Sequence, residues 1–183
     1  EVNKKIAYLG DSITQGIGAD KNSYLHWSAV LSELLGEENA YRNLGIGYAR
    51  SSDAASDGVW LYKAKQNDIV FVCYGVNDIF QGYSADTIKK NLQTIVDKLH
   101  EFGICVIMQT IPPFNYSEEH RGKWQEINDF IKYELKNAEL VFDCVKYLAK
   151  NDRELHTAKY GGHPNSDGCK VWGEALFGAV TEV

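Results

Sequence analysis

Four polar segments of this sequence carry residue types that together can perform acyl transfer. Ser12 directly follows an apolar run and becomes a nucleophile when a base takes its proton. His163 stands before Pro164 at a loop-to-helix junction, where its imidazole can be aimed and can act as that base. The amide of Asn77 and a backbone N–H of the glycine-containing segment 43–48 can donate to the oxyanion of a tetrahedral intermediate. These four segments contain the candidate catalytic residues.

Each segment also has an ordinary structural explanation when it is considered alone. Asp-Ser after a strand often forms a cap or an Asx turn, the glycines of residues 43–47 can form a plain turn, and Asn77-Asp78 can cap a helix. The serine segment is neither a phosphate loop nor a dinucleotide fingerprint, and it lacks the Gly-x-Ser-x-Gly elbow. The functional interpretation rests on position, because all four segments are expected at the ligand-binding end of an α/β sheet.

Short apolar runs predict the strands that position these segments. The predicted strands are Lys5–Leu9, Tyr41–Leu44, Ile69–Tyr74, Ile104–Ile111 and Leu140–Phe142. The longer runs are nearly continuous in β-branched and aromatic residues, which is typical of a parallel sheet covered on both faces. Helical patterns alternate with them, so we predict right-handed βαβ units in a single three-layer α/β/α sandwich. With no repeat or linker in the sequence, residues 1–183 are expected to form one domain.

Helical periodicity predicts four longer helices between and after these strands. The candidate N-caps are, in chain order, Asn22 or Ser23, Ser84, Ser117, and Asn165 or Ser166, and Gly36 is the expected stop of the first helix. The residues expected to face inward are Trp27, Val30, Leu31 and Leu34; Ile88, Leu92, Ile95, Val96 and Leu99; Trp124, Ile127, Ile131 and Leu135; and Trp172, Leu176 and Ala179.

Composition restricts the partners and the compartment. The formal net charge of −6 argues against nucleic acid or an anionic membrane as the main partner, since either favours a basic face. No apolar run approaches the ~20 residues that span a bilayer. The N-terminal residues do not resemble a signal peptide, but the chain starts without Met, so a cytoplasmic location and secretion after removal of a leader both stay open. The sequence indicates no oligomeric state.

The cysteines indicate neither a disulfide framework nor a metal site. Cys73 and Cys105 lie inside apolar runs, where free thiols behave as small hydrophobic side chains. The sequence has no Cys-x-x-Cys and no Cys/His cluster with zinc-like spacing. We therefore expect no metal and no cofactor.

The combination of segments resembles a known enzyme family. Gly10-Asp11-Ser12, Asn43-x-Gly45-x-Gly47, Gly75-x-Asn77-Asp78 and His163-Pro164 are similar, in the same order, to the four blocks of the SGNH (GDSL) hydrolases. The resemblance implies a flavodoxin-like sheet of five parallel strands in the order 2-1-3-4-5. It also implies Ser12 as nucleophile, His163 as base, and Asn77 as oxyanion donor beside backbone N–H groups of Ser12 and the second block. Family members include carbohydrate acetyl esterases, thioesterases, lysophospholipases and arylesterases.

The second block departs from the family pattern at one position. The family usually has its glycine five residues after the Asn, where this chain has Tyr48, and Gly47 lies one place earlier. A backbone N–H is all that the oxyanion needs, so either residue can supply it, and we favour Gly47. The segment Thr110-Ile111-Pro112-Pro113 resembles a wall of the family's substrate cleft. The predicted substrate-binding residues are Asp11, Tyr48, Asn77 and Pro112.

A larger departure concerns the acid of the catalytic triad. The family normally has it three residues before the histidine, where this chain has Tyr160. A triad carboxylate orients the imidazole and stabilises the imidazolium, and losing it can cost ~10⁴ in rate. Three interpretations stay open: a backbone carbonyl near residues 160–162 orients His163, Asp152 or Glu154 reaches in from upstream, or the protein is a slow or degenerate member.

The residues thus predict a metal-independent serine esterase that cleaves a short-chain, acetyl-type ester on a small molecule or a carbohydrate. The aromatic residues expected in or beside the loops around the site are Tyr48, Trp60, Tyr74, Phe80, Tyr83, Phe114, Tyr116 and Trp124, although many such residues belong to the core. The compact length leaves little room for a lid, which disfavours an interfacial lipase. The alternative is a catalytically weak carbohydrate- or ligand-binding protein on the same scaffold.

Overall fold

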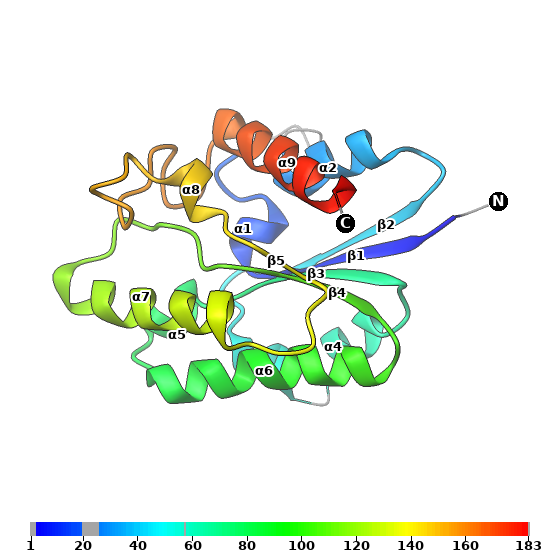
Figure 1. Cartoon of the computed structure of the whole chain (residues 1–183), viewed down its shortest axis with the longest axis horizontal. Helices are drawn as coiled ribbons and strands as arrows, with labels where there is room; N and C mark the ends of the chain where they lie inside the picture. Colours follow the sequence, from blue (N-terminus) through cyan, green and yellow to red (C-terminus); the bar gives the residue numbers. More distant parts are fainter. Residues whose placement is uncertain (1–2, 20–25, 57, 183) are drawn as a thin grey trace.

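The computed structural model describes residues 3–19, 26–56 and 58–182. Within these residues one parallel sheet has the strand order β2-β1-β3-β4-β5 (Figure 1). The strands are β1 (Lys5–Gly10), β2 (Ala40–Gly45), β3 (Ile69–Cys73), β4 (Cys105–Gln109) and β5 (Leu140–Phe142). The predicted α/β fold with sheet order 2-1-3-4-5 is confirmed.

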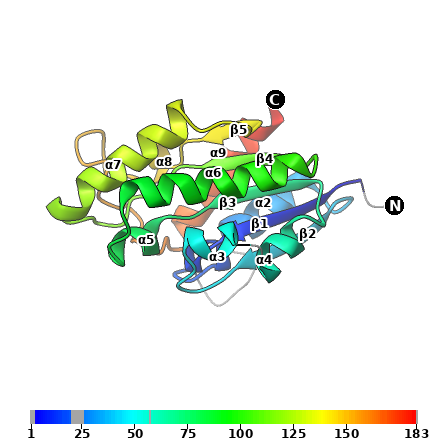
Figure 2. The ribbon, with the colours of Figure 1, turned by 90° about the horizontal axis from the view of Figure 1, so that it is seen from below.

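Helices cover both faces of the sheet. On one face lie α2 (Trp27–Leu35) and α9 (Ser166–Thr181), and on the other lie α6 (Ala85–Glu101) and α7 (Glu118–Tyr133) (Figures 1 and 2). The shorter helices are α1 (Ser12–Gln15), α3 (Ser51–Ala55), α4 (Val59–Ala64), α5 (Val76–Phe80) and α8 (Val145–Leu148). This layering buries the nearly continuous apolar strands from both sides, as a parallel sheet requires.

The amphipathic patterns place most of the predicted residues in the core. Ser84 caps α6 by accepting a hydrogen bond from the N–H of Thr87, and the whole predicted stripe of that helix is buried. Between α2 and α9 the indoles of Trp27 and Trp172 stack with their ring centres 4.9 Å apart. A Cβ at Gly173 would overlap Val30, so this glycine lets the two helices approach closely.

Several predicted boundaries differ from the structure. The fourth strand ends at Gln109 and not at Ile111, because the N–H of Ile111 donates to the side chain of Asn128 on α7 and not to a neighbouring strand. Leu34 is exposed in the last turn of α2, and Leu135 packs inward from beyond the end of α7. The candidate caps Asn22 and Ser23 lie outside the described residues, and α2 begins after His26.

The register of the central strands brings the candidate segments together. Gly10, the last residue of β1, pairs with Gly45 at the end of β2 and with Cys73 at the end of β3. The three segments that follow these strands therefore start side by side at one edge of the sheet. A Cβ at Gly45 would overlap the backbone of α1, so the absence of a side chain lets the turn after β1 rest on the end of β2.

Candidate active site

Ser12 is the first residue of the short helix α1. Asp11 precedes it as the N-cap, and its carboxylate accepts a hydrogen bond of 3.0 Å from the N–H of Ile13. The helix ends at Gly16 in the left-handed conformation, which favours glycine. A first-turn N–H has no partner within its own helix, so the N–H of Ser12 is available to an anionic oxygen. This tight turn presents the half-buried hydroxyl of Ser12 at the end of the sheet.

His163 meets Ser12 across 151 residues of sequence. Its Nε2 lies 2.9 Å from the Oγ of Ser12, a hydrogen-bond distance suited to proton transfer from the hydroxyl. The edge-to-face contact with Phe114, at 5.2 Å between ring centres, packs the imidazole from the side. Burial lowers the pKa of His163, so the ring is neutral and able to accept a proton at neutral pH.

Asn77 lies in α5 with its amide anchored to the neighbouring loop. Its Nδ2 donates a 2.9 Å hydrogen bond to the carbonyl of Ala49, which leaves the second amide hydrogen for another acceptor. The next residue, Asp78, is fully buried and accepts bonds from the backbone N–H and the hydroxyl of Ser51. Burial raises the pKa of Asp78, while the bonds from Ser51 act in the opposite direction. The pair Asn77-Asp78 thus holds the segment that follows β2.

That segment contains a tight turn, because the N–H of Ala49 donates to the carbonyl of Ile46 at 3.1 Å. Gly47 and Tyr48 form its two central positions. Within the part of the chain that the structure describes, neither of their N–H groups has a hydrogen-bond acceptor. The geometry leaves both Gly47 and Tyr48 as candidate donors to an oxyanion.

These groups line one cavity of about 500 Å³. Its lining residues are Asp11, Ser12, Ile13, Gln15, Ile17, Gly47, Tyr48, Val76, Asn77, Phe80, Phe114 and His163. Asp11 is only 3% exposed and is engaged at the cap of α1. Burial is the main cause that raises the pKa of Asp11 to about 7. Pro112 is buried, is not among the lining residues, and accepts a hydrogen bond from Tyr116.

Sequence reasoning missed several residues that shape this site. Gln15, Ile17 and Val76 line the cavity, and the only signal that could have found them is their proximity to Ser12 and Asn77 in the chain. Of the aromatic residues considered, Tyr48, Phe80 and Phe114 line the cavity. By contrast, Tyr74, Tyr116 and Trp124 are buried in the core. Sequence patterns such as side-chain alternation and loop position do not distinguish the aromatic residues that line the cavity from those buried in the core.

No carboxylate or carbonyl among the described residues accepts a hydrogen bond from Nδ1 of His163. Glu154 forms an ion pair of 2.9 Å with Lys150, which lowers the pKa of that carboxyl, and Asp152 is exposed. The carbonyl of Tyr160 accepts a bond from the N–H of Asn165 instead. Within the described residues His163 is thus positioned by packing against Phe114 and by its bond to Ser12, and the partner of its Nδ1 stays a prediction.

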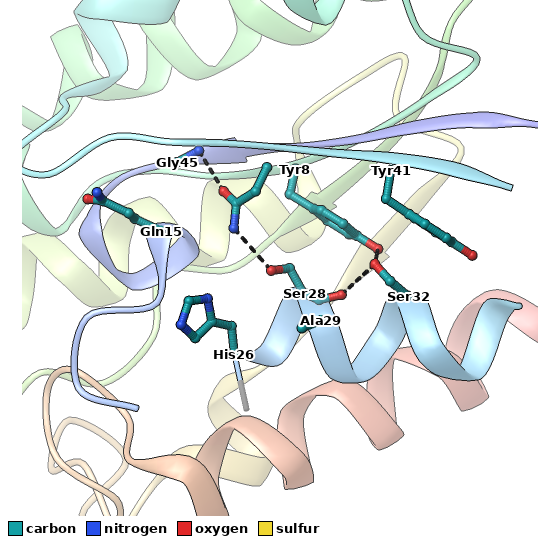
Figure 3. A pocket seen from close by; sticks show the side chains of 9 residues that line it. Tyr8, Gln15, His26, Ser28, Ala29, Ser32, Tyr41 and Gly45 are labelled. Atoms are coloured by element: carbon teal, nitrogen blue, oxygen red, sulfur yellow. Dashed lines mark hydrogen bonds between the residues drawn. The ribbon is translucent and has the colours of Figure 1, made fainter. Parts of the chain in front are cut away.

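A second cavity of about 510 Å³ lies between α2 and the edge strand β2 (Figure 3). Its polar groups bond to one another, as in the chain from Tyr8 through the hydroxyl of Ser32 to the carbonyl of Ser28. Asn43 donates to the carbonyl of Thr14 at 2.9 Å and to the hydroxyl of Ser28 at 3.2 Å. This network ties α1 and α2 to β2 and so supports the turn that carries Ser12.

Two further observations concern metals and membranes. Among the described residues, no group of three or more His, Cys, Asp or Glu side chains could hold a metal ion. None of the helices in the described ranges is long and apolar enough to cross a bilayer.

Comparison with known proteins identifies the family. The model of the GDSL-like lipase/acylhydrolase family matches residues 8–171, so the chain belongs to this family. Comparison with curated proteins gives no match.

Solved structures support the fold. A protein assigned to the lipolytic G-D-S-L family from Desulfitobacterium hafniense is 22% identical, with 97% of this chain and 99% of that chain covered and a TM-score of 0.78. The psychrotrophic esterase EstA from Pseudoalteromonas is 18% identical over 97% of both chains, with a TM-score of 0.72. A carbohydrate acetylesterase family member from Sinorhizobium meliloti is 16% identical over 98% of both chains, with a TM-score of 0.75. At these identities the likeness shows the shared fold alone.

Proposed function

We propose that this chain is a serine esterase that hydrolyses short-chain, acetyl-type esters of a small alcohol or a carbohydrate. The observation that carries this proposal is the 2.9 Å contact between the Oγ of Ser12 and the Nε2 of His163. A hydroxyl at the first position of a helix, bonded to a neutral imidazole, is the pairing that nucleophilic acyl transfer needs. Membership of the acylhydrolase family supports the same reaction class.

The proposed reaction proceeds in two halves. His163 takes the proton of Ser12 as its Oγ attacks the ester carbonyl, and the tetrahedral oxyanion forms. Collapse of this intermediate breaks the bond to the alcohol oxygen, which receives the proton from His163. Water then attacks the acyl-serine with His163 again as base, and the acid leaves as Ser12 regains its proton. No metal or redox partner enters this balance.

Three donors are proposed for the oxyanion. The first-turn N–H of Ser12, a free N–H of Gly47 or Tyr48, and the second amide hydrogen of Asn77 all belong to residues that line one cavity. Because the Asn77 amide is anchored at Ala49, it donates without reorganising during the reaction, which is the property that makes such donors effective. In this scheme Gly47 remains the favoured donor of its turn.

The remaining predicted substrate residues act indirectly in this proposal. Asp11 influences the substrate through the α1 turn that its carboxylate caps. Pro112 influences it through Tyr116, whose hydroxyl donates to the Pro112 carbonyl at 3.1 Å and whose ring stacks on Phe80, a lining residue, at 5.7 Å between ring centres. Substrate contact itself is proposed for Asn77 and Tyr48, which line the cavity beside Ser12.

For His163 we propose a Ser-His dyad without a triad carboxylate. Desolvation is the only cause of its lowered pKa, whereas a nearby carboxylate would raise that pKa. The ring is then oriented by packing against Phe114 and by its bond to Ser12. The dyad keeps the base neutral but gives up part of the stabilisation of the imidazolium.

The test compares Ser12→Ala with Ser56→Ala, a change of an exposed serine outside the cavity. Hydrolysis of p-nitrophenyl acetate should disappear in the first variant and persist in the second, with both proteins folded by circular dichroism. A serine-directed phosphonate should label Ser12 alone in the wild type. Equal rates for the wild type and Ser12→Ala would favour the alternative, a catalytically weak binding protein, which the unpartnered Nδ1 of His163 in the described structure supports.

A further inference from the structure

Tyr48 combines two unfavourable features at the rim of the Ser12 cavity. Its backbone has a φ of 63°, in the left-handed region where a bulky residue is a genuine outlier. Its side chain is 84% exposed, the largest exposure among the exposed large hydrophobic residues of the described chain. Strained backbones of this kind cluster at functional sites, and here the strained residue lines the cavity that contains Ser12.

The turn explains why the strain persists. Gly47 occupies the second position of this turn and Tyr48 the third, and the third position has a positive φ, which Gly or Asn normally supplies. The turn cannot relax easily, because the carbonyl of Ala49 is held by Asn77 and the N–H of Ser51 by Asp78. Glycine would fit position 48 with less strain, so the fold itself does not call for the tyrosine.

The tyrosine ring makes no visible contribution to packing. Within the described residues, its hydroxyl has no hydrogen-bond partner and its ring has no aromatic or cation neighbour. An apolar ring left in water is itself unfavourable. A residue that is costly in both backbone and side chain, and that the fold does not use, is explained by a ligand that covers its ring.

The other lining residues indicate what that ligand is. Phe80 also lines the cavity and is 46% exposed, and its ring stands 5.4 Å from that of Phe114. The polar side chains beside the catalytic pair are the neutral amides of Gln15 and Asn77. Among the lining residues that the structure describes, the only carboxylate is that of Asp11, which is buried and caps α1. Exposed rings with neutral amides and no exposed charge suit an uncharged ring that carries hydroxyl groups.

We propose that Tyr48 is a specificity-determining residue that stacks on the leaving-group ring of the substrate, a neutral pyranose-type sugar. The proposal rests on the proposed esterase function and names the alcohol part of its substrate. Tyr48 thus increases the affinity for the sugar ester and lowers the stability of the fold, since a glycine at position 48 would have less backbone strain.

The experiment uses Tyr48→Gly and Tyr48→Phe, with Tyr62→Ala as the matched control. Tyr62 is another exposed tyrosine, but it lies on α4 outside the cavity. The kcat/KM for an acetylated methyl glucopyranoside is compared with that for ethyl acetate in each protein. This ratio should fall about tenfold in Tyr48→Gly, the size expected for one lost aromatic contact. It should be retained in Tyr48→Phe and in Tyr62→Ala, and the Tm of Tyr48→Gly should rise.

Each contrary outcome is distinguishable. A raised Tm with an unchanged ratio in Tyr48→Gly would show that the strained residue has no role in binding. If Tyr48→Gly lost as much kcat/KM with p-nitrophenyl acetate as with the sugar ester, Tyr48 would contact an aromatic leaving group equally well. That result would overturn the assignment of a sugar. If the wild type cleaves no ester, the proposed function fails, and binding of methyl glucopyranoside by NMR titration still tests Tyr48. Binding should then be weaker in Tyr48→Gly than in Tyr62→Ala, and equal binding would reject the proposal.

Discussion

The two sides of the cavity that contains Ser12 are held in different ways. On the Ser12 side, hydrogen bonds fix each segment. Asp11 caps α1, and Asn43 of β2 donates to the backbone of α1. Asn77 and Asp78 bond to the backbone of the segment after β2. On the other side His163 lies in a stretch without regular secondary structure, and its ring is placed by its contacts with Phe114 and Ser12.

This difference separates two tasks of a catalytic site. Oxyanion donors must be rigid before the reaction, because their benefit comes from avoiding reorganisation, and a hydrogen-bonded framework provides that rigidity. A base needs orientation and a suitable pKa, and packing supplies the first while burial sets the second. The histidine side can therefore differ from a full triad without loss of the Ser12–His163 contact.

The largest effect after loss of the nucleophile is expected on the hydrogen-bonded side. Asn77→Ala should lower kcat by about 10²–10³, because one proposed, preorganised donor to the oxyanion is lost. KM should change much less, since the interaction strengthens in the transition state. Asn91→Ala is the control, because Asn91 also bonds to the segment after β2, at Ser51, but does not line the cavity. Steady-state kinetics showing a change in KM alone would assign Asn77 to substrate binding.

A smaller effect is expected from the two carboxylates that precede His163 in the sequence, Asp152 and Glu154. Asp152→Asn and Glu154→Gln should each keep activity within about tenfold of the wild type, against the ~10⁴ loss of a triad acid. The reason is that Glu154 is paired with Lys150 and Asp152 is exposed. If the kcat of either variant fell by three or more orders of magnitude with the fold intact, the mutated residue would be the triad acid. His163 would then be held by a hydrogen bond, as the residues on the Ser12 side are.

Tyr160→Asp tests the same comparison by adding a carboxylate on the His163 side. Residue 160 stands three places before His163, so a carboxylate there can meet Nδ1 if the loop follows the family geometry. We expect a higher kcat, because the imidazolium gains a charge partner. An unchanged or lower kcat, together with an unchanged pH profile, would show that position 160 does not reach the ring.

The smallest effect is a shift in pH dependence. Burial lowers the pKa of His163, so the ring stays neutral to a lower pH than a free histidine. The acidic limb of kcat/KM should therefore lie below about 6.5, the usual pKa of the side chain. In Tyr160→Asp the limb should move to higher pH, because a carboxylate favours the protonated ring. A wild-type limb above about 6.5 would reveal a carboxylate partner that the described residues do not show.

Much of the fold follows from local patterns. The runs at residues 69–73 and 105–108 are continuous in apolar residues, as buried parallel strands are. Ser84 and Asn165, both expected as caps, cap α6 and α9. The end of the fourth strand was missed because a side chain from α7, Asn128, takes the N–H of Ile111. Such a partner lies far away in the chain and leaves no trace in local periodicity.

The sequence by itself determined the parallel α/β architecture and the four segments from which the candidate site is built, because strand and helix periodicity and motif order are local properties of the chain. Tertiary structure alone decided how Ser12 and His163 meet, since their contact joins residues 151 positions apart in the chain. It also decided that Tyr48 keeps a conformation suited to glycine, because Asn77 and Asp78 of another element hold the loop around it. Hydrogen bonds and packing between distant residues impose these geometries, and local sequence patterns do not reveal which distant residues will meet.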